Sequence, residues 1–323
     1  MAEFDLIARI AARTFARGDV ALGIGDDGAL LAPPAGQQVV AVCDTLNIGV
    51  HFPHDSTPGD IGWKALAVNL SDLAAMGATP AWALLSLSLP RADAAFVDAF
   101  MRGFSALADA AGVALVGGDT TRGPLSVCVT ALGFVPGGEA LTRTGAQPGD
   151  AVFVSGTLGD AAAALRLSHA QLQSGAPEVR AVRQRLNCPT PRLALGQALR
   201  GKATAALDVS DGLLADLSHL ARGSGVGIEL HADRLPCSNA LAALFDAPTR
   251  LRHQATGGDD YELVFTLPPH RLDAVHAALG HSDVALTCIG RVIAGEGVRL
   301  LGTDGAPIEF ECAGWEHFTE RAS

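Results

Sequence analysis

The stretch "KALAVNLSDLAAMGATPAWALLSLSL" (64–89) contains the change of pattern that decides the fold. Its first part belongs to a helix predicted over about 60–76, with Thr57 as a plausible N-cap and Pro58 near the first turn. The letters "GATP" end that helix, and the alternating "AWALLSLSL" predicts a strand. A helix that passes directly into a strand is typical of an α/β protein.

Neither the longest uncharged stretch nor the N-terminal residues indicate a membrane segment. The longest uncharged stretch runs from Leu73 to Pro90, but Pro80 interrupts it, so we interpret it as a helix end, a turn and a strand. The start "MAEFDLIARI" places Glu3 and Asp5 where a signal peptide needs positive charge. We therefore expect a cytoplasmic protein without a membrane partner.

Composition narrows the class of protein further. The chain has 323 residues, of which 49% are hydrophobic and 18% charged, and these values favour two well-buried globular domains. The net charge of −11 argues against nucleic-acid binding. The six cysteines are scattered without a CxxC motif, which favours buried thiols in a reducing compartment over disulfides or zinc.

Strand-like and helix-like segments alternate along the whole chain, so we expect α/β structure in both halves. The glycine, proline and polar residues of "LTRTGAQPGD" (141–150) are typical of a connector and place a domain boundary there, giving domains 1–145 and 146–323. The further helices are expected over 92–111, 159–170, 190–200 and 211–225.

Acidic residues recur where apolar strands end or helices begin, at Asp26, Asp27, Asp44, Asp72, Asp119, Asp208 and Asp211. Each of them except Asp72 also fits a turn or a helix N-cap, and taken singly that structural role is the better explanation. Asp72 lies within an otherwise apolar helix, where a carboxylate is costly to bury without a cation or donor.

Taken together, these carboxylates indicate a metal site if their loops converge. Two unit charges 4 Å apart repel by about 4 kcal/mol at an effective dielectric constant near 20, so a converging set needs cations. Oxygen ligands favour hard ions, Mg²⁺ first, and several Mg²⁺ ions usually hold phosphates. The sequence contains no P-loop and no protein-kinase HRD or DFG motif, and the acidic "GIGDDG" does not suit a dinucleotide.

The chain resembles the thiamine-monophosphate kinase family of the aminoimidazole-ribonucleotide-synthetase-like superfamily. The matching stretches follow one another along nearly the whole chain: "EFDLIARI", "LGIGDDGALL", "DTLNIGVHF", "KALAVNLSDLAAMGATPAW", "LVGGDTTRGPLS", "LTRTGAQPGD", "VSGTLGD", "ALDVSDGL", "GGDDYELVFT" and "GWEHF". Of these, "NLSDLAAMGA" and "GGDTTRGPL" are individually specific.

The resemblance implies a two-domain fold, with an N-terminal mixed sheet and helices that pair across a homodimer and a C-terminal α/β domain. It also implies an ATP-dependent kinase that converts thiamine monophosphate to thiamine diphosphate by direct in-line transfer of the γ-phosphoryl group. ATP and several Mg²⁺ ions would lie in a cleft that the C-terminal domain completes.

The resemblance also implies roles for individual residues. Asp27, Asp44, Asp72, Asp119, Asp208 and Asp211 match metal-binding carboxylates. Gly118, Asp119, Arg143 and Ser210 match ATP contacts, and His51, Asp259 and Trp315 match contacts with the thiamine substrate. No side chain is expected to act as a general base, because metal and arginine assist the transfer.

This sequence departs from the family pattern at a few positions. Ala111 stands near the place of an aromatic ATP contact, which leaves the adenine contact open. Asp259 replaces a glutamate and is one methylene shorter. Asp26 either shapes its loop or reaches metal through water.

Two other functions fit the same residues. The first is another ATP-dependent synthetase of the superfamily, although the N-terminal segment lacks the reactive Cys and Lys of a selenophosphate synthetase. The second is a non-catalytic dimer that binds Mg-nucleotide without releasing ADP.

Overall fold

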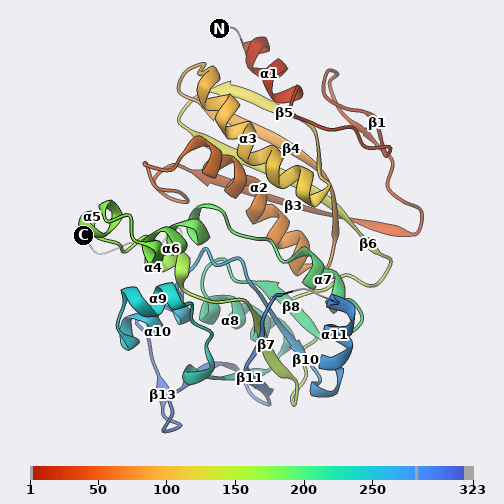
Figure 1. The fold of residues 1–323 in the computed structure, drawn as a ribbon. Coiled ribbons are helices and arrows are strands. Elements are labelled where there is room, and N and C mark those ends of the chain that lie inside the picture. The colour runs from red at the N-terminus through yellow and green to blue at the C-terminus, as the bar shows by residue number, and fades with distance from the viewer. Residues whose placement is uncertain (1–2, 281–282, 316–323) are drawn as a thin grey trace. The chain divides into compact units, whose positions relative to one another are not determined.

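The computed structural model describes residues 3–280 and 283–315. The chain divides into two compact units, residues 1–140 and 141–323, and each has its own sheet (Figure 1). In the described part of the chain, none of the helices combines the length and apolar character needed to cross a membrane.

Unit 1 is built on a mixed sheet of four strands in the order β3-β6-β4-β5. β4 and β5 run parallel, and β6 runs antiparallel to both β3 and β4. A short antiparallel pair, β1 and β2, precedes the sheet. The elements of unit 1 are α1 (Glu3–Ala11), β1 (Val20–Leu22), β2 (Leu30–Leu31), β3 (Gln37–Asn47), α2 (Pro58–Ala75), β4 (Thr79–Leu89), α3 (Ala94–Ala111), β5 (Ala114–Arg122) and β6 (Ser126–Pro136).

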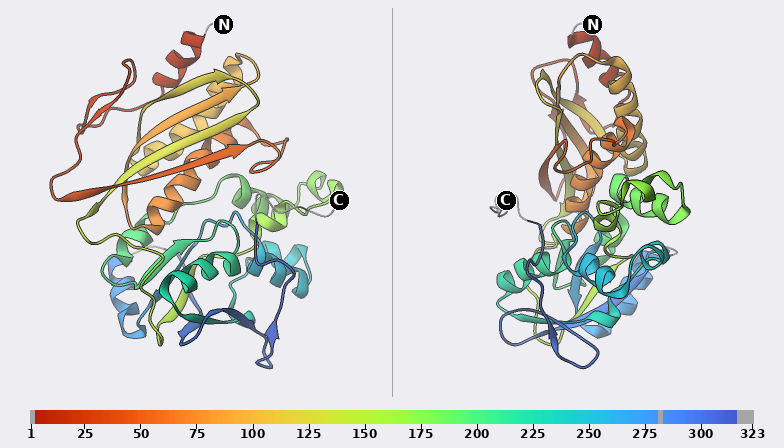
Figure 2. Two further views of the ribbon diagram at one scale, coloured as in Figure 1. Left: turned by 180° about the vertical axis from the view of Figure 1, so that it is seen from behind. Right: turned by 90° about the vertical axis from the view of Figure 1, so that its left-hand side faces the viewer.

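The helices α2 and α3 lie on one face of this sheet, and among the described residues of unit 1 no helix covers the other face (Figure 2). Local signals set their ends: the Thr57 side chain accepts the N–H of Asp60 at 3.1 Å and caps α2. Gly112, with φ 67°, ends α3 in the left-handed conformation. The predicted helix and strand over 60–89 are therefore confirmed, with the strand beginning at Thr79, inside the expected turn.

Unit 2 contains a seven-stranded sheet in the order β13-β12-β9-β11-β7-β10-β8. Only β9 and β12 pair in parallel within it. Its strands are β7 (Ala151–Ser155), β8 (Ala205–Asp208), β9 (Gly227–His231), β10 (Leu263–Leu267), β11 (Leu286–Ile293), β12 (Gly297–Leu301) and β13 (Pro307–Ile308).

The helical elements of unit 2 are α4 (Asp160–Ala164), α5 (His169–Gln173), α6 (Pro177–Asn187), α7 (Leu193–Leu199), α8 (Leu213–Ser224), η1 (Ala232–Arg234), α9 (Asn239–Leu244), α10 (Ala247–Thr256), η2 (Pro269–Arg271) and α11 (Leu272–Leu279). The side chains of Leu213, Leu217 and Leu220 on α8 join Val152 and Val154 of β7 in the buried core.

The helix expected over 159–170 is wrong in this form, because the structure divides it into α4 and α5. Ser168 begins a new helix: its hydroxyl accepts the N–H of Gln171, and the Gln171 side chain accepts the N–H of Ser168 in return. This capping box competes with continuation of the first helix. The helices α6, α9, α10 and α11 were not anticipated from the sequence.

Candidate functional site

The loop that follows β8 folds around one carboxylate. Asp216, in the first turn of α8, accepts the backbone N–H groups of Ser210, Asp211 and Gly212 on a single oxygen, at 3.0, 3.1 and 3.1 Å. The side chain of Asp216 is buried. The sequence analysis missed this residue, although an acid within the apolar "LLADL" is the same signal that singled out Asp72.

Three carboxylates meet at this loop. Burial, together with the negative charges of Asp208 and Asp211, raises the pKa of Asp216 to about 7. Asp208 itself is buried at the end of β8. Such mutual repulsion is relieved by a bound cation.

A second segment, 257–262, is hydrogen-bonded to the same loop. The N–H of Asp259 donates to the carbonyl of Ser210 at 2.8 Å, and the N–H of Trp315 donates to the carbonyl of Asp211 at 2.9 Å. The Tyr261 hydroxyl donates to Asp259 Oδ1 at 3.1 Å. The structure therefore brings Ser210, Asp211, Asp259 and Trp315 together within unit 2, and Trp315 keeps 44% of its surface exposed.

Arg143 does not join this cluster through its backbone. The hydroxyl of Ser224, the last residue of α8, donates to the carbonyl of Arg143 at 3.5 Å. The loop that contains Ser210 precedes the first turn of the same helix, and twelve residues of helix span about 18 Å. The exposed Arg143 side chain therefore starts from the far end of α8.

In unit 1, Asn69 links two of the predicted metal ligands. The N–H of Asp44 on β3 donates to Asn69 Oδ1 at 3.2 Å, while Asn69 Nδ2 donates to the carbonyl of Ala65. Asp72 lies three residues further along α2 and so shares a helix face with Asn69. The backbone of Asp44 therefore lies against a buried amide on the helix face that also carries Asp72, and this amide was not predicted from the sequence.

Asp119 stands farther away on the same sheet. Asp44 lies opposite Val129 of β6, and Leu85 of β4 lies between Val129 and Gly118 of β5. Three inter-strand spacings, about 14 Å, therefore separate the backbone of Asp44 from that of Gly118, the residue that precedes Asp119. Gly118, with φ 146°, has no room for a Cβ, which would lie 1.8 Å from the carbonyl oxygen of Leu85.

The two aspartates between β1 and β2 differ in their contacts. The backbone N–H of Asp27 donates to Asp26 Oδ1 at 2.8 Å, so Asp26 shapes the loop. Asp27 is exposed and follows Gly25, whose φ of 125° requires glycine.

His51 is held in a tight turn after β3. The N–H of Asn47 donates to His51 Nδ1 at 3.0 Å. Lys64, which is buried on α2, donates through Nζ to the carbonyl oxygen of His51 at 2.8 Å. Sequence reasoning did not select Lys64, although a lysine within an apolar helix is a detectable signal.

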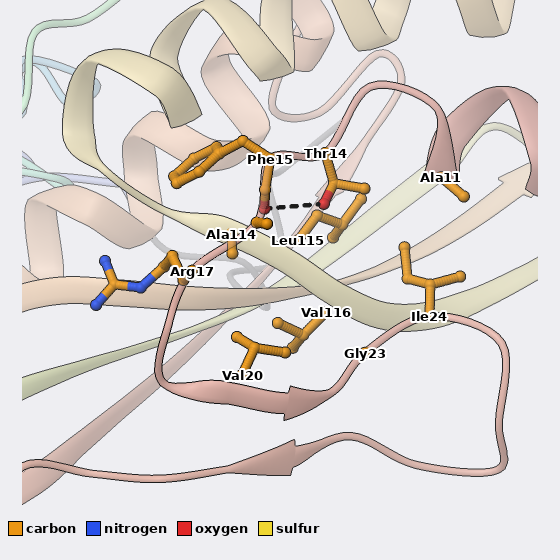
Figure 3. A pocket seen from close by; sticks show the side chains of 11 residues that line it. Ala11, Thr14, Phe15, Arg17, Val20, Gly23, Ile24, Ala114, Leu115 and Val116 are labelled. Carbon is orange, nitrogen blue, oxygen red and sulfur yellow. Dashed lines mark hydrogen bonds between the residues drawn. The ribbon is translucent and has the colours of Figure 1, made fainter.

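A cavity of about 300 Å³ lies beside the acidic loop and β5 (Figure 3). Its wall continues through Gly23 and Ile24 toward Asp27 and through Val116 toward Gly118. Figure 3 shows the Phe15 ring close to the Ala114 end of this wall. The residues that line the cavity are Ala11, Thr14, Phe15, Ala16, Arg17, Val20, Gly23, Ile24, Ala114, Leu115 and Val116.

The predicted metal ligands are divided between the units: Asp27, Asp44, Asp72 and Asp119 lie in unit 1, and Asp208 and Asp211 lie in unit 2. Among the described residues, no group of three or more His, Cys, Asp or Glu side chains has an arrangement that could hold a metal ion. The assembled cluster therefore stays a prediction.

Comparisons with known families cover both units. Residues 25–135 match the family described as AIR synthase related protein, N-terminal domain, and residues 147–302 match the corresponding C-terminal domain. The thiamine-monophosphate kinase of Salmonella typhimurium is 47% identical over 98% of both chains, and that of Escherichia coli K12 is 46% identical over the same shares.

Solved structures agree with this assignment. The crystal structure of thiamine-monophosphate kinase from Stenotrophomonas maltophilia superposes with a TM-score of 0.87 at 54% identity, covering 94% of this chain and 97% of that one. A structure described as "AaThiL complexed with AMPPCP and TMP" has a TM-score of 0.78 at 35% identity and covers 98% and 96%. The family models match both units, and the identity to thiamine-monophosphate kinases extends over nearly the full length. The chain therefore belongs to the thiamine-monophosphate kinase family of AIR synthase related proteins.

Proposed function

We propose that the chain phosphorylates thiamine monophosphate to thiamine diphosphate with ATP. The observation that carries the proposal is the hydrogen-bonded cluster of Ser210, Asp211, Asp259 and Trp315, which joins ATP, metal and thiamine contacts expected from separate motifs. The family relative solved with AMPPCP and TMP supports the same pair of ligands.

His51, Asp259 and Trp315 would contact thiamine monophosphate, with the exposed Trp315 ring offering a stacking surface. Gly118, Asp119, Arg143 and Ser210 would contact ATP. Because Ala111 supplies no aromatic ring, we place the adenine base in the cavity beside Phe15, whose apolar wall leads toward Gly118.

The carboxylates suit Mg²⁺. Asp27, Asp44, Asp72 and Asp119 of unit 1 and Asp208 and Asp211 of unit 2 offer only oxygen ligands. The raised pKa of Asp216, caused first by burial and then by the negative charges of Asp208 and Asp211, shows that carboxylate charge gathers at this loop. When bound, Mg²⁺ would neutralise phosphate oxygens and draw both substrates together.

The transfer needs alignment more than proton removal. An oxygen of the terminal phosphate of thiamine monophosphate attacks the γ-phosphorus of ATP, the bond from that phosphorus to the bridging oxygen breaks, and ADP leaves. The attacking oxygen is already anionic, so no general base is required. Arg143 would reduce the repulsion between the two polyanions, and Asp259 would orient the thiamine moiety.

We further propose that the N-terminal domain (1–145) forms a homodimer through its open sheet face and that domain 146–323 completes the active site. On this face Val39 and Leu84 are 46% and 36% exposed, and Ala41 lies beside them on β3. Uncovered apolar sheet faces of this kind favour association. The expectation of buried thiols is wrong, since three of the six cysteines are exposed and three are partly buried, but all six are free thiols, which supports a cytoplasmic location.

A coupled assay of ADP formation tests the activity. With Mg²⁺ and ATP, thiamine monophosphate should release ADP and yield thiamine diphosphate, whereas free thiamine and aminoimidazole precursors should not. ADP release with an aminoimidazole precursor instead would assign the chain to a synthetase. ATP·Mg binding without ADP release under every condition would leave a non-catalytic binding protein.

Asp72→Asn belongs in the same assay, because it removes a charge that we assign to metal binding. Turnover should fall by at least about a hundredfold at saturating Mg²⁺. Asp98→Asn is the matched control, since Asp98 lies on the surface of α3 in an ion pair with Arg9. Near-wild-type turnover of Asp72→Asn would remove Asp72 from the proposed metal site.

A further inference from the structure

The segment 257–262 contains an unusual backbone. Asp259 and Tyr261 have φ angles of 67° and 51°, and in the described part of the chain they are the non-glycine residues with positive φ. A bulky residue such as tyrosine rarely adopts this conformation, so surrounding contacts must impose it.

Two buried carboxylates anchor the segment on either side of Tyr261. The side chain of Asp260 accepts the N–H of Gly159 with both oxygens, at 3.0 and 2.8 Å. The side chain of Glu262, 1% exposed, lies at the start of β10. Tyr261 is thus held between two fixed points, and Asp259 directly precedes the first of them.

Glu262 is the centre of a network of charged groups. Glu262 Oε1 accepts from Arg185 Nη2 of α6 at 2.6 Å, and Glu262 Oε2 accepts from Arg192 Nε at 2.6 Å and from the Ser155 hydroxyl at 2.5 Å. Arg192 Nη2 makes a second hydrogen bond to Oε1, which completes a bidentate pair. Gly156 leaves the room for this carboxylate, because a Cβ there would lie 2.2 Å from Oε1.

The network reaches the strained backbone itself. Arg185 Nη2, besides binding Glu262, lies 3.4 Å from the carbonyl oxygen of Asp260, between Asp259 and Tyr261. The N–H groups of those two residues then donate to the carbonyls of Ser210 and Val209, both at 2.8 Å. Arg185 therefore connects α6 to the loop that presents Asp259. The helix α6 itself has no contact role in the proposed reaction.

We propose that Glu262, Arg185 and Arg192 are positioning residues that hold the left-handed backbone at Asp259 and Tyr261 and so set how the enzyme recognises the thiamine moiety. This inference rests on the proposed function, because it assigns Asp259 to thiamine monophosphate. The shorter side chain of Asp259, compared with the glutamate of the family pattern, makes its reach depend on the backbone position.

The test uses Arg185→Gln in the full-length protein. Glu262→Gln would leave both arginines facing a neutral amide and is expected to destabilise unit 2 as a whole, whereas Arg185→Gln leaves the Arg192–Glu262 pair in place. The KM for thiamine monophosphate should rise about tenfold or more, while the KM for ATP should stay within about twofold. Arg185→Lys, which keeps the charge, should recover part of the loss.

Hydrogen exchange supplies a readout that does not depend on turnover. The amides of Asp259 and Tyr261 should exchange faster in Arg185→Gln than in the wild type. Arg291→Gln is the matched control, since Arg291 forms an exposed ion pair with Glu229 in the same unit, and it should change neither quantity.

Unchanged exchange of both amides in Arg185→Gln would overturn the proposal, as would an equal rise in the KM values for both substrates. Failure of the wild-type protein to phosphorylate thiamine monophosphate would instead refute the proposed function, and the exchange measurement would still decide whether Arg185 holds the segment.

Discussion

A single oxygen of Asp216 accepts three consecutive backbone N–H groups, from Ser210, Asp211 and Gly212. Replacing this side chain would leave three donors without their acceptor, and each buried unsatisfied group costs about 1–3 kcal/mol. The residue thus supports the loop that carries Ser210 and the proposed metal ligand Asp211, although it matched no family motif.

Asp216 also predicts how stability changes with pH in metal-free buffer. Its pKa is about 7 in the folded protein and 3.8 as the reference value, so the folded state binds its proton more tightly. This contribution is fully present below about pH 4 and is lost as the pH rises through about 7. The difference between these two pKa values corresponds to at most about 4 kcal/mol of stability.

Urea unfolding of the wild type and of Asp216→Asn between about pH 4 and 7.5 measures this effect. The free energy of unfolding of the wild type should decline relative to that of the variant across this range. Mg²⁺ should reduce the decline, because a cation near Asp208 and Asp211 removes part of the repulsion. Parallel pH profiles for the two proteins would show that Asp216 does not titrate in this way.

At the scale of elements, the contact between α2 and α3 depends on two glycines. A Cβ on Gly103 of α3 would lie 1.8 Å from the carbonyl oxygen of Gly59, and one on Gly62 of α2 would lie 2.0 Å from that of Phe100. Backbone therefore packs directly against backbone, and α2 carries Asp72 and Lys64 on this support.

Gly103→Ala should destabilise the protein by about 1–3 kcal/mol. The helix propensity of alanine favours the substitution by about 1 kcal/mol, but the new methyl group must push the two helix backbones apart. Gly59→Ala is the matched control on the opposing helix, because its Cβ would lie 3.5 Å from the nearest atom, an ordinary contact. A variant Gly103→Ala as stable as the wild type in urea unfolding would contradict this account.

At the scale of the whole molecule, the proposed dimer makes the open sheet face of unit 1 a buried surface. Leu84→Lys places a charge in the middle of that face and should shift the protein from dimer to monomer in sedimentation velocity. Leu165→Lys is the control, because Leu165 is an exposed leucine of unit 2 at 53%. A monomeric wild type, or a dimer unaffected by Leu84→Lys, would exclude this face as the interface.

Much of the local structure, and the family, could be predicted from the sequence. The Thr57 cap, the Gly112 end and the alternating "LLSLSL" act within a few residues, so α2, α3 and β4 followed from them, whereas α1, β1 and β2 were not anticipated. The ordered motifs identified the thiamine-monophosphate kinase family, which the family models and relatives confirm. Predictions failed where a nearby cap competed, as at Ser168.

The side chains that support the site became apparent from the folded structure. Glu262 meets Arg185 across 77 positions and Ser155 across 107, and the positive φ of Tyr261 occurs directly beside these contacts. Asp216 lies only a few residues from its hydrogen-bond partners, yet its raised pKa comes from burial and from the charge of Asp208. Hydrogen bonds between distant segments and the burial of charge arise when the chain has folded, so no local pattern encodes them.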